Sequence, residues 1–537
     1  LDDATHKRHH AQLGRLLQAR AAAEVSIFEL TGHLNQASEL LGADERLKLC
    51  ELNLQAGSKA RAAAAFATAF EHFSHGVKLL PAGAWQQHYP LAFALHLGQA
   101  ECTYLSGRFA ETAPLLDQVL AHAQGHDDKA RSYFVRGVYF RHIGDTTLAT
   151  WSVLDGLKEF GIDIPRAPST PRTLAELLWT QRALGGRSIE QLLALPAMTD
   201  ARQIAILRML SDASASAYFV GPNLLTVLLL RMIRLSLEQG NHALSAIAYV
   251  FFAAVVGSGL GDFDKGEQMG QLALRLVERY PDAFVESQVK CIYVAIANHF
   301  KNPVRAGSQL LIDSWRRGEE SGNLTYAVYA VNTAARWSYL IGEPLDATHA
   351  DCDRYMEAVA RTHHDAGYQA LNLIRQVVRA LQGRTISPTE LSAPDFDEER
   401  CLRPLRAVQM RVQVQFHNNF RAALCLIFGR HSEGLAHCQK NEPDADEVML
   451  GLLDLVEHYH VYALLLAGQA ACEPRGSLVR RRLMWKLAKK LRKLRRWAET
   501  SPQNFRHRYL MARAEQRRLR GSGDRALGDY QEALVAA

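Results

Sequence analysis

Residues 94–123, ALHLGQAECTYLSGRFAETAPLLDQVLAHA, contain the pattern that decides the fold. A first apolar stripe at helical spacing includes Tyr104, and a second, later stripe includes Leu116. Gly107 lies between them and allows the left-handed turn that ends a helix, while Phe109 is expected to fill the joint between the two helices. Because each helix has one apolar face, each needs a partner. The segment therefore predicts a helical hairpin of the tetratricopeptide type.

The same turn recurs along the chain. Counted from the turn residue, small residues at +5 and +12 fall on one helical face, where a second helix can approach closely. The full matches are Gly144 with Ala149 and Gly156, Gly261 with Gly266 and Ala273, Asn302 with Gly307 and Ser314, and Gly521 with Ala526 and Ala533; partial matches follow Gly342 and Gly429, and Gly383 and Gly468 continue the spacing. A spacing of about 40 residues predicts an all-α, tetratricopeptide-like solenoid, a superhelix of about ten hairpins.

Composition agrees with an all-α protein, because alternating β-branched runs are scarce and only 17 of 537 residues are proline. The eight cysteines have no paired spacing, which indicates reduced thiols and a cytoplasmic location. The first residues, LDDATHKRHH, contain no signal peptide, and we expect a segment of a longer protein. The uncharged stretch 243–260 favours a buried helix over a membrane span, because it ends in a repeat turn.

Two proline-rich breaks interrupt the helical pattern. Residues 165–171, PRAPSTP, cannot be helical and predict a hinge. Residues 383–404 are rich in Ser, Pro and acids and predict a long loop. We therefore expect three blocks: an N-terminal helical block over 1–165, a central solenoid over 166–385, and a C-terminal block with a basic helix over 386–537.

No motif predicts catalysis in this chain. Gly57-Ser58-Lys59 lacks the rest of a Walker A sequence, and residues 257–262, GSGLGD, follow a helix where a phosphate loop would follow a strand. Asp262-Phe263-Asp264 has no kinase catalytic loop to accompany it. The histidines lack Cys or carboxylate neighbours at ligand spacing, so no metal or cofactor site is expected.

A basic segment is the sharpest anomaly of the sequence. Residues 473–525 hold eighteen Lys and Arg against four acids, in a chain of net charge +6. Within it, Arg480 to Arg496 forms an amphipathic pattern whose apolar stripe is Leu483, Leu487, Leu491 and Leu494. Such a helix would bind nucleic acid, an anionic membrane or an acidic partner. The plainer interpretation is a solenoid helix with a solvated face that docks on acidic residues 395–399 or 442–447.

Motifs near both ends resemble a known family. The N-terminal order is H-x3-GRLL from His10, IF-x4-HLN from Ile27, LNLQAG-x-KA from Leu52, and then Trp85 and Tyr89; residues 161–165, GIDIP, follow, and the C-terminal pattern is Trp497, Pro502, Asn504, Phe505, His507, Ala514, Glu515, Gly521, Tyr530 and Ala533. This order is similar to the helical region of bacterial STAND-type signalling ATPases.

That resemblance carries implications beyond this chain. In the family, an Orc/AAA-like ATPase domain and sometimes a Ser/Thr kinase precede such a region, and GAF and histidine kinase or diguanylate cyclase domains follow it. ATP and Mg²⁺ are implied only for a neighbouring domain. We expect a non-catalytic regulatory scaffold that couples partner binding to those domains, with adjacent domains or other proteins as partners and with oligomerisation open. The alternative is a nucleic-acid-binding activator arm that uses residues 480–496.

Candidate interaction residues follow from these interpretations. Aromatic residues on the first helices of hairpins are expected to face a groove, and basic residues of the amphipathic segment are expected to meet an anionic partner. The aromatic candidates are Tyr104, Tyr139, Tyr249 and Trp337, and the basic candidates are Arg481, Lys486, Lys489, Lys490, Lys493 and Arg496.

Overall fold

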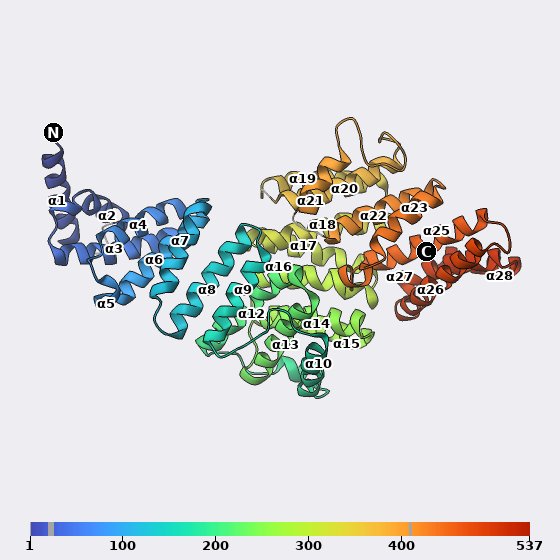
Figure 1. Ribbon diagram of the computed structural model, residues 1–537, viewed down its shortest axis with the longest axis horizontal. Helices are drawn as coiled ribbons and strands as arrows, with labels where there is room; N and C mark the ends of the chain where they lie inside the picture. The colour runs from blue at the N-terminus through green and yellow to red at the C-terminus, as the bar shows by residue number, and fades with distance from the viewer. Residues whose placement is uncertain (1, 20–25, 363, 408–410) are drawn as a thin grey trace. The chain divides into compact units, whose positions relative to one another are not determined.

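The computed structural model describes residues 2–19, 26–362, 364–407 and 411–537, and Figure 1 shows their helices. Apart from two isolated β-bridges, Ala197–Asn241 and Ala393–Phe396, regular secondary structure in these ranges is helical. The all-α prediction is confirmed. The chain divides into two compact units, Leu1–Thr173 with Arg208–Leu228, and Leu174–Leu207 with Leu229–Ala537.

The first unit begins with a series of antiparallel neighbours. Its helices are α1 (Asp3–Ala19), α2 (Ile27–Gln36), the 3₁₀ turn η1 (Ser38–Leu40), α3 (Ala43–Ala62), α4 (Phe66–Leu79), α5 (Ala84–Gln87), α6 (Tyr89–Leu105), α7 (Phe109–His122), α8 (Gly125–His142) and α9 (Thr146–Glu159). Three further helices cross the boundaries between the units: α10 (Thr170–Leu184), α12 (Ala201–Val220) and α13 (Pro222–Gln239).

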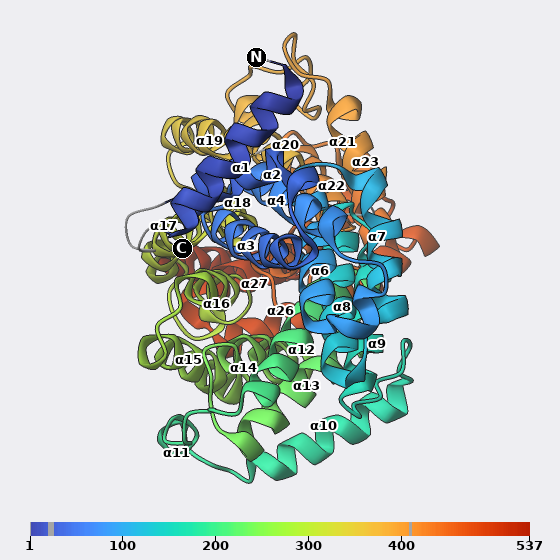
Figure 2. The ribbon, with the colours of Figure 1, turned by 90° about the vertical axis from the view of Figure 1, so that its left-hand side faces the viewer.

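The second unit contains the remaining helices. They are α11 (Ile189–Leu193), α14 (Ser245–Ala254), the π-helix η2 (Val255–Gly259), α15 (Phe263–Arg279), α16 (Ala283–Ile296), the 3₁₀ turns η3 (Asn298–Phe300) and η4 (Val304–Gly307), α17 (Ser308–Ser321), α18 (Leu324–Leu340), α19 (Leu345–Ala360), α20 (Asp365–Leu381), α21 (Glu398–Ala407), α22 (Arg411–Ile427), α23 (His431–Asn441), α24 (Ala445–Val448), α25 (Leu453–Cys472), α26 (Leu478–Thr500), α27 (Pro502–Leu519) and α28 (Gly523–Ala536). Neighbouring elements α14, α15 and α16 pack side by side (Figure 2).

The turn at Gly107 has the predicted conformation. Its φ of +83° is left-handed, and the Arg108 amide donates a 3.0 Å hydrogen bond to the Thr103 carbonyl, which closes the end of α6. Phe109, however, is exposed, so the prediction that it fills the joint is wrong. Phe263, at the same place after the Gly261 turn, is buried as expected. The glycine turns at 107, 144, 261, 342, 429 and 521 therefore share the left-handed conformation and not a buried aromatic ring, whereas Asn302 does not have a positive φ.

Small residues at the predicted positions do allow close helix packing. A Cβ on Gly156 would lie 2.6 Å from the Met209 side chain, and one on Gly266 would lie 2.9 Å from the Ala253 carbonyl oxygen. Neither site has room for a larger side chain. The other members of the pattern are buried as well: Ala149, Ala273, Gly307, Ser314, Ala526 and Ala533.

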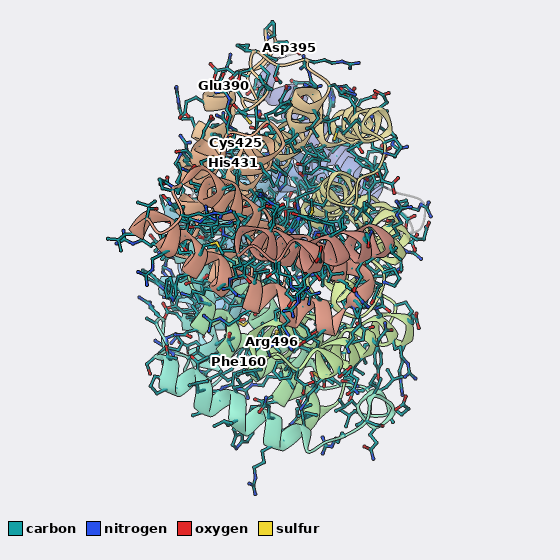
Figure 3. All side chains as sticks on the ribbon, turned by 90° about the vertical axis from the view of Figure 1, so that its right-hand side faces the viewer. Phe160, Glu390, Asp395, Cys425, His431 and Arg496 are labelled. Atoms are coloured by element: carbon teal, nitrogen blue, oxygen red, sulfur yellow. The ribbon has the colours of Figure 1, made fainter. Side chains whose placement is uncertain are left out.

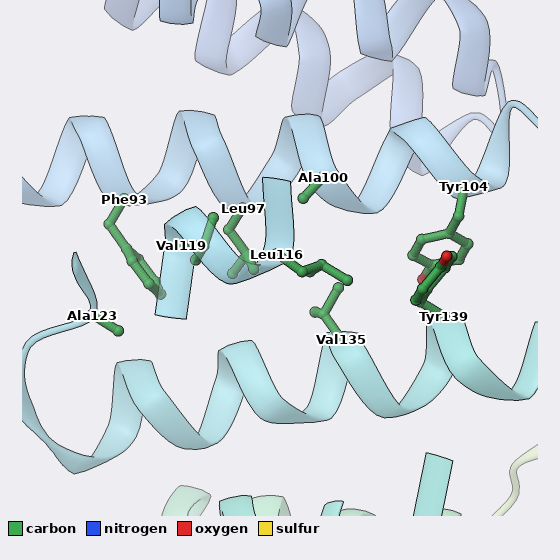
Figure 4. Packing of buried hydrophobic residues seen from close by; sticks show 9 residues of the cluster. All are labelled: Phe93, Leu97, Ala100, Tyr104, Leu116, Val119, Ala123, Val135 and Tyr139. Carbon is green, nitrogen blue, oxygen red and sulfur yellow. The ribbon is translucent and has the colours of Figure 1, made fainter. Parts of the chain in front are cut away.

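Side chains of three consecutive helices form the core of the first unit around the deciding segment. Phe93, Leu97 and Ala100 of α6 pack with Leu116 and Val119 of α7, and residues of α8 complete the cluster (Figure 4). The apolar stripes therefore meet as the periodicity predicts.

Two predicted boundaries need correction. Gly468 lies inside α25, against the ring of His431, and the turn after α25 is at Gly476, where φ is +94°. The local pattern misplaced this turn because a glycine that permits close packing and a glycine that ends a helix look alike in sequence. Pro404 lies within α21, so the second break ends at residue 397.

Both breaks are observed, but the first is shorter than the predicted 165–171, because α10 begins at Thr170 and takes Pro171 into its first turn, where a proline is tolerated. Residues 161–169 separate α9 from α10 without a helix, and residues 382–397 form a loop that contains Glu390 and Asp395 (Figure 3). The division into three blocks over 1–165, 166–385 and 386–537 stays a prediction.

Most of the uncharged stretch 243–260 is buried inside the fold, and only Gly259 and Leu260 at its end are exposed. Nearly every residue of α14 is buried, and the helix passes into η2 before the Gly261 turn. In the described residues, no helix is both long and apolar enough to cross a membrane.

Candidate functional site

Helix α26 carries the basic segment, and local sequence explains both of its ends. The Ser477 hydroxyl accepts a 3.1 Å hydrogen bond from the Arg480 amide and caps the first turn. The helix ends at Thr500, just before Pro502 begins α27. Its predicted apolar stripe, with Trp497 and Ala498, packs against α25 and α27, although Leu483 is only half-buried.

Part of the positive charge faces inward and is neutralised within the fold. Lys490 is only 6 % exposed, and its ammonium lies 3.1 Å from a Glu442 carboxylate oxygen. Lys486 lies 3.8 Å from the same carboxylate, and Lys493 pairs with Asp446. The predicted docking on residues 442–447 is therefore confirmed. Residues 395–399 do not take this role, because Asp395 is held by Arg379 at 2.9 Å.

Aromatic rings complete the Lys490 environment. Its ammonium lies 4.3 Å from the ring centroid of Tyr462 and 4.8 Å from that of Tyr459. Burial lowers the pKa of Lys490, and the ion pair with Glu442 offsets part of that shift. Burial alone would raise the pKa of Glu442, but Lys490 and the Tyr462 hydroxyl hold it below its ordinary value. The lowered pKa keeps Glu442 ionised near neutral pH, beside the Lys490 ammonium.

Arg480 joins the ends of neighbouring helices. One guanidinium nitrogen donates 3.1 Å hydrogen bonds to the carbonyls of Ala470 and Glu473, and the other donates a 3.1 Å bond to the carbonyl of Leu519. The carbonyls at a helix C-terminus lack partners within the helix, and a guanidinium satisfies them. This arginine is therefore structural.

The opposite side of α26 points into solvent. The exposed residues on this side fall within an arc of about 100° on an ideal helix. We call the apolar and cationic residues of this arc the outer face of α26, and they are Leu478, Arg481, Arg482, Trp485, Lys489, Arg492 and Arg496. Glu499 lies at the edge of the same arc and pairs with Arg495 at 2.8 Å. No acidic partner within ion-pair distance is recorded for these cations in the described part of the chain.

Arg496 differs from the other cations of the outer face. A Cβ on Gly261 would lie 1.5 Å from an Arg496 guanidinium nitrogen, so the guanidinium lies directly against the α14–α15 turn. Arg496 is labelled in Figure 3. The four cations Arg481, Arg482, Lys489 and Arg492 are the ones that remain open to a partner.

A shallow hollow borders the outer face where α26 meets the end of α27. Its volume is about 440 Å³, and its lining is Gly476, Arg480, Arg481, Met484, Trp485, Ala488, Leu519 and Arg520. The lining combines four apolar side chains with the guanidinium groups of Arg480, Arg481 and Arg520, of which Arg480 is bonded to main-chain carbonyls. Such a site suits an apolar group attached to an anion.

The four aromatic candidates do not face a groove. Tyr104 and Tyr139 are buried between α6 and α8, with ring centroids 6.1 Å apart (Figure 4). Tyr249 and Trp337 are buried in the second unit. The expectation of accessible rings is wrong because large aromatic side chains fill the space between neighbouring hairpins.

Sequence reasoning missed the role of α27 in closing the second unit. The Asn504 side-chain amide donates 2.7 Å hydrogen bonds to the carbonyls of His299 and Asn302 and accepts one of 3.2 Å from the Val304 amide. Arg508 donates a 3.0 Å hydrogen bond to the Leu340 carbonyl at the end of α18. The NF motif at 504–505 was a signal, but the sequence did not reveal its partner.

Phe505 packs beside these bonds. It is buried, and its ring centroid lies 6.0 Å from that of Phe300. We call Asn504, Phe505 and Arg508 the α27 clasp. Through the clasp, α27 contacts turns about 200 residues earlier in the chain.

Repeated helical hairpins with left-handed glycine turns and small residues at their contacts define the class: this chain is a tetratricopeptide-like helical solenoid protein, a fold suited to protein–protein interaction. No model of a known protein family matches the sequence. The chain is 23 % identical over 401 residues to the hybrid signal transduction histidine kinase G of Dictyostelium discoideum, covering 68 % of this chain. It spans only 12 % of that kinase.

Among solved structures, yeast Tom70 aligns at 10 % identity with a TM-score of 0.30, over 91 % of this chain and 92 % of Tom70. The fold assignment rests on the hairpins themselves.

Proposed function

We propose that this chain is the non-catalytic regulatory arm of a multidomain cytoplasmic signalling protein and that it couples partner binding to neighbouring ATPase and output domains. The similarity to a histidine kinase supports the signalling context. The motifs at 10–60 and 497–533 support the STAND-type context. ATP and Mg²⁺ would then bind a neighbouring domain and not this chain.

The observation that carries this proposal is the α27 clasp. In a simple solenoid each repeat contacts only its neighbours, so a local change in structure affects distant repeats little. Here Asn504 ties α27 to the η3–η4 turns, and Arg508 ties it to the end of α18. A partner that displaces α27 must therefore also release contacts in the middle of the unit. That linkage gives a binding event a defined structural output.

Polar residues that could suggest a chemical site take part in the fold. No cluster of three or more His, Cys, Asp or Glu side chains in the described ranges is arranged to hold a metal ion. Residues 257–262, which resemble a phosphate loop in sequence, form part of a π-helix and a repeat turn. Arg336 and Asp454 form a buried ion pair at 2.9 Å, which holds α18 to α25.

An affinity experiment tests this proposal. The chain, immobilised and exposed to a lysate of its own organism, should retain an ATPase, histidine kinase or diguanylate cyclase, identified by mass spectrometry. Binding is then repeated with the purified domain. Asn504→Ala should strengthen that binding, because the partner no longer has to release the clasp, whereas Gln503→Ala, at the exposed neighbouring position, should leave it unchanged. Failure to retain any protein of these classes, or equal binding by both variants, would contradict the proposal.

A further inference from the structure

We infer that the outer face of α26 is a docking surface for an anionic lipid bilayer. The inference is independent of the protein-interaction role proposed above. It rests on the unpaired cations, on the apolar side chains exposed among them, and on the rigid seating of the helix.

The open cations of α26 form a row of one sign. Arg481, Arg482, Lys489 and Arg492 lie on one side of the helix, whereas the inward cations Lys490 and Lys493 are already paired with acids. An unpaired cation close to an anionic bilayer gains about a fivefold increase in binding. Four of them together provide enough attraction for measurable association.

Apolar side chains are exposed on the same side. Leu478 is 79 % exposed and Trp485 is 63 % exposed. Val479, the residue after Leu478, is also exposed and lies about 60° beyond the edge of the outer face. Exposed large apolar groups next to cations mark interaction sites. An indole at the bilayer interface places its ring among the headgroups, and aliphatic tips enter the acyl region. These three side chains lie in the first half of α26, so that end would enter the bilayer most deeply.

Helix α26 needs no ordering before it binds. Leu487, Leu491 and Leu494 are buried against the neighbouring helices, and the Lys490–Glu442 pair fixes the rotation of the helix. A helix that folds only on the membrane must first pay for ordering its backbone. Here the outer face is already presented, over a length of about 27 Å from Leu478 to Arg496.

An anionic bilayer uses more of this surface than nucleic acid does. A phosphate backbone would satisfy the cations, and a base would stack on Trp485. Neither would gain from Leu478 and Val479, which are aliphatic and exposed. Only an apolar phase next to a layer of anions binds the aliphatic tips, the indole and the cations at the same time.

Vesicle co-sedimentation tests the cations. The full chain is mixed with vesicles of 30 % phosphatidylglycerol in phosphatidylcholine, or of phosphatidylcholine alone, at about 50 and 300 mM salt. We expect binding to the anionic vesicles only, weakened by salt. Arg481→Ala/Lys489→Ala/Arg492→Ala should weaken binding about a hundredfold. The matched control, Arg305→Ala/Arg316→Ala/Arg361→Ala, removes the same charge from exposed positions elsewhere in the unit and should bind as the wild type does.

A second pair of measurements tests the apolar contribution. Leu478→Ser/Val479→Ser should weaken vesicle binding about tenfold without changing the fold, because both side chains are exposed. The emission of Trp485 is obtained by subtracting the spectrum of Trp485→Phe from that of the wild type. Its maximum should shift to shorter wavelength when anionic vesicles are added.

Three outcomes would overturn the inference. The first is the absence of binding to anionic vesicles at low salt. The second is an equal loss of vesicle binding in the triple variant and in its control. The third is tight binding of a single-stranded oligonucleotide that Leu478→Ser/Val479→Ser does not change, together with no binding of vesicles. The last outcome would assign the outer face to nucleic acid. Circular dichroism and thermal melting confirm that each variant is folded before binding is compared.

Discussion

The side-chain amide of Asn504 donates a 2.7 Å hydrogen bond to the main-chain carbonyl of His299, across 205 positions of sequence. Both groups are buried, so neither has water as an alternative partner. A bond of this kind links the last hairpins of the second unit to its middle. It also makes a single amide side chain responsible for a long-range contact.

Removal of that amide should destabilise the second unit. Asn504→Ala leaves the buried His299 carbonyl, the half-buried Asn302 carbonyl and the buried Val304 amide short of partners. We expect a loss of about 2–4 kcal/mol in the free energy of unfolding, measured by denaturant titration. Gln503→Ala is the matched control, because Gln503 is exposed and makes one bond of 3.1 Å to the Lys301 carbonyl. A loss of stability equal to that of the control would show that water replaces the hydrogen bonds of the Asn504 side chain.

Two adjacent lysines of α26 should differ in their effect on stability. Lys490 is buried between two tyrosine rings and paired with Glu442, whereas Lys489 is exposed. Lys490→Ala should cost about 2 kcal/mol, because it removes the nearer of the two lysines that pair with the Glu442 carboxylate in a partly buried site. Lys489→Ala should change stability by less than about 0.5 kcal/mol. Thermal melting of the two variants side by side measures the difference, and equal melting temperatures would refute the inward and outward division of charge.

A methyl group should have opposite effects at two helical glycines. At Gly266 a Cβ would lie 2.9 Å from the Ala253 carbonyl oxygen, so Gly266→Ala forces α14 and α15 apart at a cost of about 1–3 kcal/mol. At Gly528 in α28 a Cβ would meet nothing within 4 Å. Gly528→Ala should therefore stabilise the protein by about 0.5–1 kcal/mol, since alanine loses less backbone entropy in a helix. Differential scanning calorimetry measures both shifts, and a stabilising Gly266→Ala would exclude the close packing.

Buried histidines should make the second unit sensitive to mild acid. Burial lowers the pKa of His458 to about 4, and the charge of Lys490 acts in the same direction. A histidine in the unfolded chain titrates near 6.5, so below that pH the unfolded state binds a proton that the folded state refuses. This contribution to stability is fully present above pH 6.5 and is lost as the pH falls toward 4.

The variant His458→Asn removes the titrating group and keeps a polar side chain beside Asn419, which lies 3.0 Å from the His458 ring. Its stability should fall less steeply between pH 6.5 and 4, by about 3 kcal/mol over that range. Denaturant titrations at several pH values measure the slope. An unchanged slope would mean that His458 binds a proton as readily in the folded protein as in the unfolded chain.

The sequence by itself determined the local units of this protein. Apolar residues at helical spacing around Gly107, and small residues such as Gly156 and Gly266, carry enough information for the hairpins, because turns and stripes depend on residues a few positions apart. The amphipathic pattern of 480–496 likewise defined α26 and its apolar face. Local pattern failed at Gly468, where close packing and a helix end have the same sequence signal.

Only the tertiary structure decided which residues meet across the repeats. It divided the cations of α26 into a paired inner set and the outer face. It placed Tyr104 and Trp337, which were expected to face a groove, in the interior, and it joined Asn504 to His299 by a hydrogen bond. These outcomes depend on how the hairpins stack, which sums small contacts between residues far apart in sequence. Helical periodicity states which face of a helix is apolar, but it does not state which distant helix will cover it.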